Sequence, residues 1–134
     1  MGRASVRPKT ILVIEPDAKT REVEALLLRF FGYEVLCAST AGEGLSRVKR
    51  EGPDMVVTDA FASGEGGAQF LRRLAHAGRD IPVLVLTSYP MEDAGALFGS
   101  APCEILSKPC DAARLRSAVA RLATHGAPRA YAMS

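Results

Sequence analysis

Two hydrophobic periods alternate along the chain. Thr10–Ile14 is a continuous apolar run closed by Glu15 and Pro16, a pattern typical of a strand buried on both faces. From Ala18 to Phe31 the apolar residues recur every three or four positions, which predicts a helix that stops at Gly32. The inward face of this helix is predicted to consist of Val23, Leu26, Leu27 and Phe30. The chain therefore begins with a buried strand followed by an amphipathic helix.

The same alternation of strand and helix continues to the end of the chain. Further strands are predicted at Glu34–Ala38, Asp54–Thr58, Pro82–Thr87 and Glu104–Ser107. Helices are indicated by apolar residues at helical spacing and by stop signals at Gly52 and Gly78. Their predicted inward residues are Ala41, Leu45, Val48, Phe70, Leu71, Leu74, Ala75, Leu115, Ala118, Val119 and Leu122. A weaker helix is predicted at about Met91–Gly99, and Asp111 is predicted to cap the last helix.

Five such strand–helix units predict an α/β fold with a single domain. Parallel strands need long crossovers, which are nearly always right-handed, so the units predict a doubly wound five-stranded parallel sheet with helices on both faces. The domain is expected to span residues 9–124. Residues 1–8 and 125–134 are expected to be flexible tails, because they are rich in Gly, Pro, Ala and Arg.

Composition and charge narrow the class of protein. No segment approaches the ~20 consecutive apolar residues of a membrane span, and the first residues lack the apolar core of a signal sequence. We therefore expect a cytoplasmic protein with no membrane association. A formal net charge of +2 with scattered arginines gives no reason to expect nucleic-acid binding. Cys37, Cys103 and Cys110 lack the paired spacing of a zinc site and are expected to be reduced thiols.

Polar residues follow four of the predicted strands. They are Glu15, Asp17, Asp59, Thr87, Ser88 and Lys108. In open parallel sheets, ligands bind outside the carboxyl ends of the strands, so these side chains are expected to converge. A carboxylate can be a nucleophile and a metal ligand, a hydroxyl can donate to a phosphoryl oxygen, and an ammonium can neutralise its charge. Each residue alone has an ordinary structural explanation, but their joint placement favours a site for a metal ion and a phosphoryl group.

Four ordered segments resemble the receiver domains of bacterial response regulators. They are Ile11–Glu15, Pro53–Asp59, Val83–Ser88 and Lys108-Pro109, and the resemblance covers about residues 9–124. It implies the flavodoxin-like strand order 2-1-3-4-5. It also implies a phosphoacceptor domain of two-component signalling rather than an enzyme, with at most self-phosphorylation and self-dephosphorylation.

The resemblance assigns the acceptor and the metal. Asp59 would accept a phosphoryl group from a histidine kinase, and Glu15 and Asp59 would bind Mg²⁺. Asp17 and the backbone carbonyl of Phe61 are additional candidate metal ligands.

The resemblance also assigns the response to phosphorylation. Thr87 would follow the phosphoryl oxygen and Lys108 would pair with it, with a cis peptide bond before Pro109. The new phosphate charge would shift a surface formed by the fourth helix, the fifth strand and the last helix, toward a downstream protein that the resemblance does not specify.

Three positions depart from the family pattern. Pro16 stands where the family has a second acid that binds the metal, and a proline ring offers neither oxygen nor N–H, so weaker Mg²⁺ binding is expected. Ile105 stands where the family commonly has an aromatic residue that moves with Thr87. The loop Ser63–Gly67 lacks the usual proline and has more glycine, which adds backbone freedom.

Several alternatives stay open at this point. The leading hypothesis is a phosphoryl-accepting receiver, either stand-alone or part of a larger regulator or hybrid kinase. The second is a pseudo-receiver that binds a partner protein without phosphorylation, which Pro16 and Ile105 favour. A flavin-binding flavodoxin-like protein is disfavoured, because the acidic turn at Glu15 has no glycine and would repel a phosphate. The apolar stripe of the last helix would serve either a homodimer or packing on the sheet.

Overall fold

The computed structural model describes residues 7–59, 67–78, 80–88, 103–126 and 132–133. Its strands are β1 (Thr10–Ile14), β2 (Glu34–Ala38), β3 (Met55–Asp59), β4 (Val83–Thr87), β5 (Glu104–Ser107) and β6 (Ala132–Met133). Its helices are α1 (Ala18–Phe30), α2 (Ala41–Glu51), α3 (Gly67–Gly78) and α5 (Ala112–His125). The helix expected at 91–99, the loop residues 63–66 and the carbonyl of Phe61 lie outside the described residues.

All strands run parallel in one sheet, in the order β2-β1-β3-β4-β5-β6. The predicted order 2-1-3-4-5 is therefore confirmed. The two-residue strand β6 pairs with β5 at the edge of the sheet and was not predicted, because it lies in the segment 125–134 that was expected to be a tail. No helix among the described ranges is long and apolar enough to cross a membrane.

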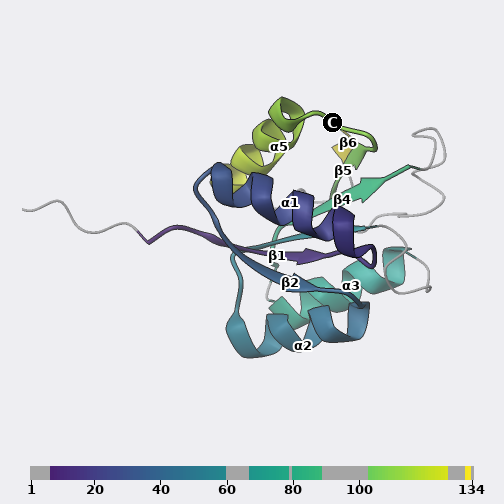
Figure 1. Ribbon diagram of the computed structural model, residues 1–134. Helices are drawn as coiled ribbons and strands as arrows, with labels where there is room; N and C mark the ends of the chain where they lie inside the picture. Colours follow the sequence, from purple (N-terminus) through teal and green to yellow (C-terminus); the bar gives the residue numbers. More distant parts are fainter. Residues whose placement is uncertain (1–6, 60–66, 79, 89–102, 127–131, 134) are drawn as a thin grey trace, which may run out of the picture.

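The sheet has one helical layer on each face (Figure 1). The helices α1 and α5 cover one face, and α2 and α3 cover the other. The predicted inward residues of α5, Leu115, Ala118, Val119 and Leu122, are all buried against the sheet. The stripe on α5 is thus used for packing within the chain, and Asp111 caps this helix as predicted by accepting from the backbone N–H of Arg114.

Of the inward face predicted for α1, only Leu27 packs against the core, and the other three residues do not. Val23, Leu26 and Phe30 are 56%, 66% and 82% exposed, whereas Ala25 and Leu28 are buried. The helix carries apolar residues on nearly every side, so its hydrophobic period does not define one face. The buried positions are instead Glu24, Ala25 and Leu28, on the side of the helix from which Arg21 donates to the carbonyl oxygen of Glu15 at 2.8 Å.

Substitutions on α1 test this corrected orientation. Leu28→Ala should lower the free energy of unfolding by about 2–5 kcal/mol, because it opens a cavity in the core. Leu26→Ala should change it by less than about 0.5 kcal/mol, because Leu26 is mostly exposed. Urea unfolding of the two variants measures both values, and a larger loss for Leu26→Ala would contradict the orientation.

Candidate functional site

The parallel register brings four of the predicted site residues to one edge of the sheet. Asp59 ends β3 and lies opposite Leu86 of β4, while Thr87 ends β4 opposite Ser107 of β5. Glu15 follows the last residue of β1, and its backbone N–H bonds to the carbonyl of Ala38 at 3.0 Å. The strand ends therefore place side chains from separate parts of the chain at the same site.

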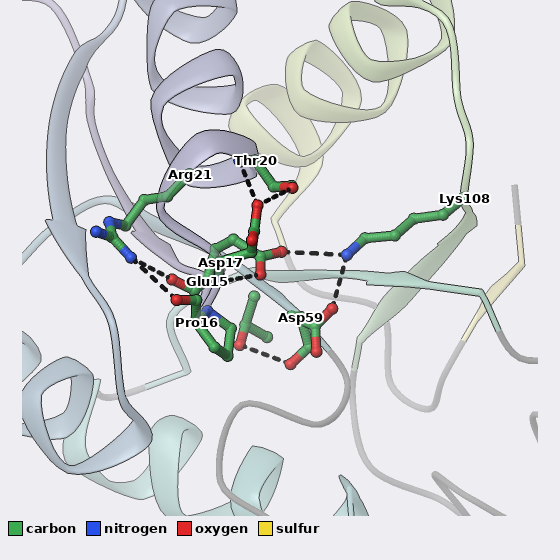
Figure 2. Close-up of polar contacts among 8 residues, drawn as sticks. Glu15, Pro16, Asp17, Thr20, Arg21, Asp59 and Lys108 are labelled. Atoms are coloured by element: carbon green, nitrogen blue, oxygen red, sulfur yellow. Dashed lines mark hydrogen bonds and ion pairs between the residues drawn. The ribbon is translucent and has the colours of Figure 1, made fainter.

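Lys108 connects the two carboxylates of the site. Its Nζ lies 2.7 Å from Oδ2 of Asp59 and 3.1 Å from Oε1 of Glu15. Figure 2 shows the lysine side chain reaching between the two acids. Burial lowers the pKa of Lys108, but the hydrogen bonds and charges of Asp59 and Glu15 outweigh burial and raise it. The ammonium therefore remains charged and neutralises part of the acidic site.

The β5–α5 turn places this lysine. The backbone N–H of Lys108 donates to the carbonyl of Thr87 at 2.7 Å, which ties the turn to the end of β4. The Lys108-Pro109 peptide bond is cis, as the resemblance implied. Thr87 is buried at 2% exposure, at the end of the strand beside β5.

The β1–α1 turn is held by its own hydrogen bonds. Oε2 of Glu15 accepts from the backbone N–H of Asp17 at 3.0 Å, and Arg21 contacts the carbonyl oxygens of Glu15 and Pro16 (Figure 2). Pro16 is exposed and contributes no side-chain ligand. The turn is thus ordered without the second acid that the family usually has there.

The carboxylate of Asp17 caps α1. Its Oδ2 accepts from the backbone N–H of Thr20 at 2.9 Å and from the hydroxyl of Thr20 at 2.7 Å. The hydrogen bond from the Thr20 backbone is the main cause that lowers the pKa of Asp17. A role for Asp17 as a metal ligand stays a prediction, and such a ligand would have to keep or replace these capping bonds.

The acids of this edge fit a magnesium ion that keeps part of its water shell. Within the described residues, no three His, Cys, Asp or Glu side chains gather closely enough to hold a metal by themselves. Magnesium typically retains several waters and is bound by one or two carboxylates. Glu15 and Asp59, which face each other across Lys108, supply two carboxylates of that kind.

Comparison with known proteins identifies the family. A model of the response regulator receiver domain matches residues 11–120 of this chain. The protein belongs to this family. Receiver domains are signalling phosphoacceptors rather than enzymes, which is the class predicted from the sequence.

Similar proteins agree with this assignment. The receiver chain is 32% identical over 129 residues to the response regulator MprA of Mycobacterium leprae, covering 92% of this chain and 57% of MprA. It is 28% identical over 110 residues to the "Probable transcriptional regulatory protein TcrX" of Mycobacterium tuberculosis, covering 81% of this chain and 47% of TcrX. The chain thus spans about half the length of these relatives.

Solved structures show the same fold. The receiver domain of the sensor histidine kinase PA1611 from Pseudomonas aeruginosa superposes with a TM-score of 0.78 at 21% sequence identity. The match covers 88% of this chain and 99% of that domain.

Ile105, one of the departures from the receiver pattern, is a core residue. It is fully buried on β5 and packs in the cluster that includes Phe70 and Leu74 of α3. An aliphatic side chain in that position is held by packing on the α3 side of the sheet.

A buried acid near the site was missed from the sequence. Glu24 of α1 is 9% exposed, and burial is the main cause that raises its pKa to about 7, with the charges of Glu15 and Asp59 also raising it and that of Lys108 lowering it. The sequence signal is its spacing, because Glu24 lies three residues after Arg21 and four before Leu28, both on the face turned toward the sheet. Because the predicted inward face of α1 did not include position 24, the burial of Glu24 was not predicted.

Glu24 should make stability depend on pH. A carboxyl whose pKa is 4.5 unfolded and about 7 folded is protonated in both states at low pH, and is ionised only in the unfolded state between these values. Its contribution to stability therefore falls as pH rises through this window, by about 3 kcal/mol in total. Glu24→Leu removes this contribution, so the unfolding free energy of the variant minus that of the parent should grow by about that amount from pH 4.5 to pH 8.

Chemical denaturation at several pH values measures this difference. Glu22→Leu on the exposed side of the same helix is the matched control, and its difference from the parent should stay nearly constant. A constant difference for Glu24→Leu as well would show that Glu24 does not carry the predicted proton.

Proposed function

We propose that this receiver domain accepts a phosphoryl group on Asp59 from a histidine kinase. The observation that carries the proposal is the position of Lys108, whose ammonium lies 2.7 Å from Asp59 and 3.1 Å from Glu15. A nucleophilic carboxylate beside a fixed cation suits the transfer of an anionic phosphoryl group. Thr87 ends the neighbouring strand and supplies a hydroxyl to the same edge.

The chemistry follows from these groups. An oxygen of Asp59 forms a bond to phosphorus while the bond from phosphorus to the kinase histidine nitrogen breaks, and the imidazole leaves. Lys108 then pairs with a phosphoryl oxygen in place of the free carboxylate, and Thr87 donates a hydrogen bond to another. A magnesium ion held by Glu15 and Asp59 would supply additional charge neutralisation. The receiver domain of PA1611, a protein of the same fold, is described with magnesium coordinated in its active site cleft.

The output would involve the β5 and α5 part of the surface. Arg121 of α5 donates from Nε to Oε1 of Glu104 on β5 at 3.2 Å, so the two elements are joined by charge as well as packing. Because Ile105 is buried in the core, the signal would travel through Thr87 and the Lys108 turn rather than through an aromatic side chain. A homodimer through α5 would use its outer face, where Arg114 and Arg116 are exposed.

A pseudo-receiver that binds a partner without phosphorylation is the second candidate. It is favoured by Pro16, which removes one acid, and by the capping role of Asp17. Lys108 already neutralises part of the charge of Glu15 and Asp59. Under either hypothesis, the exposed apolar residues Val23, Leu26 and Phe30 of α1 support contact with a partner protein.

Phosphorylation by a small-molecule phosphodonor distinguishes the two candidates. With acetyl phosphate and magnesium, the intact protein should gain the mass of one phosphoryl group. Asp59→Asn should gain none, because the nucleophilic oxygen is lost. Asp80→Asn is the matched control, since Asp80 is exposed and lies just before β4, at the other end of that strand, and this variant should be phosphorylated like the parent.

Two results would contradict the phosphorylation of Asp59. No mass increment on the folded parent at high magnesium would reject the phosphoacceptor and favour the pseudo-receiver. An increment that persists in Asp59→Asn would place the acceptor elsewhere.

Pro16→Asp should strengthen metal binding. The substitution restores a carboxylate beside Glu15 in a turn that Arg21 and Asp17 already hold. The magnesium concentration that gives half-maximal phosphorylation should fall about ten-fold, which corresponds to about 1.4 kcal/mol of binding free energy. Pro16→Asn is a control with similar size and no added charge. An equal effect of both variants would attribute the gain to backbone change rather than to the carboxylate.

A further inference from the structure

A pocket of about 570 Å³ opens between α1 and the start of α5, beside the acidic site. Its apolar walls are Val23, Leu27, Leu86, Pro109 and Leu115. Pockets of this size commonly bind small organic molecules when apolar walls surround a few polar groups. The proposed phosphoryl transfer makes no use of this space except through Lys108 on its edge.

Glu24 is the acid that lines this pocket, together with the polar residues Lys19, Thr20, Ser88, Lys108 and Cys110. Its side chain is 9% exposed and makes no hydrogen bond or ion pair with any residue that the structure describes. Among the described residues, every side-chain nitrogen or oxygen that is fully enclosed has a hydrogen-bond partner. Because the carboxyl oxygens of Glu24 have no such partner, they are not fully enclosed and stay accessible from the pocket that Glu24 lines. A buried carboxylate without a partner is costly, and a hydrogen-bonding ligand would remove that cost.

The charges around the pocket favour a cation. Glu15 and Asp59 lie close enough to Glu24 to add to its negative potential. Lys108 is the nearby cation, but its Nζ is already shared by Glu15 and Asp59. Lys19 also lines the pocket but is exposed on the helix surface, where water screens its charge. Near the pocket there are thus three carboxyl groups, those of Glu15, Glu24 and Asp59, and one partly buried ammonium, that of Lys108.

We propose that this pocket binds a small organic cation, namely a protonated amine or amidine on an apolar body. The cation donates charge-assisted hydrogen bonds to the carboxylate of Glu24, and the apolar body packs against Leu27, Leu86 and Leu115. This binding does not require phosphorylation of Asp59, so it stands independently of the proposed function.

A matched pair of probes tests the role of the charge. 2-Phenylethylamine carries an ammonium at pH 8, and 2-phenylethanol has nearly the same shape without the charge. Titration followed by two-dimensional amide NMR at pH 8 should show saturable binding of the amine. The expected dissociation constant is at least about ten-fold lower for the amine than for the alcohol. The shifted amides should be those of α1, the 108–110 turn and the pocket residues Leu86, Ser88 and Leu115.

Variants on α1 identify the group responsible. In Glu24→Gln the preference for the amine should disappear, while Glu22→Gln, an exposed acid on the same helix, should retain it. Glu24→Leu provides a second, apolar variant and should also bind both probes alike. Circular dichroism confirms that each variant is folded.

Three outcomes would overturn the proposal. The first is equal binding of amine and alcohol by the parent, and the second is retention of the preference in Glu24→Gln and Glu24→Leu. The third is the absence of saturable binding of the amine up to its solubility limit. Shifts confined to residues outside the pocket lining would also overturn the proposal.

Discussion

Two carboxylates at the ends of neighbouring strands are compatible in this structure because one ammonium lies between them. Without Lys108, ionised Glu15 and Asp59 would repel each other at the edge of the sheet, where both are largely buried. The turn that carries the lysine is tied to β4 through the carbonyl of Thr87. Lys108 thus joins β1 and β3 through its ammonium and β4 through its backbone N–H, and the proposed chemistry depends on it.

The acidic character of the site extends beyond the residues that resemble the family. Glu24 adds a third carboxyl on the α1 side, and its raised pKa reflects burial first and the nearby charges of Glu15 and Asp59 second. A buried acid of this kind lowers stability near neutral pH and is retained only at a cost. That cost is understandable if the carboxylate serves a ligand, whereas a purely structural helix face would favour an aliphatic residue at that position.

The strands and the site were predictable because their signals are local. Continuous apolar runs such as Thr10–Ile14 identify buried strands, and parallel strands must place Asp59, Thr87 and Lys108 at one edge. The face of α1 was not predictable from its period, because apolar residues occur on nearly every side of this helix, and packing on the sheet buries Ala25 and Leu28. The position of the Asp17 carboxylate depends on the geometry of the helix cap. The pairing of β6 with β5 is a long-range contact, and a strand of two residues is too short to give a hydrophobic pattern that predicts it.

A crystal structure with magnesium and beryllofluoride, which mimics a phosphoryl group on a carboxylate, would show whether Asp59 accepts a phosphoryl group beside Lys108. If Asp59 is the phosphoacceptor, beryllofluoride should be bonded to an oxygen of Asp59, with Nζ of Lys108 moved onto a fluorine. Magnesium should lie beside Glu15 and Asp59, with water completing its coordination. Crystals that bind neither group at saturating concentrations, with Lys108 still bridging Glu15 and Asp59, would contradict a phosphoacceptor site.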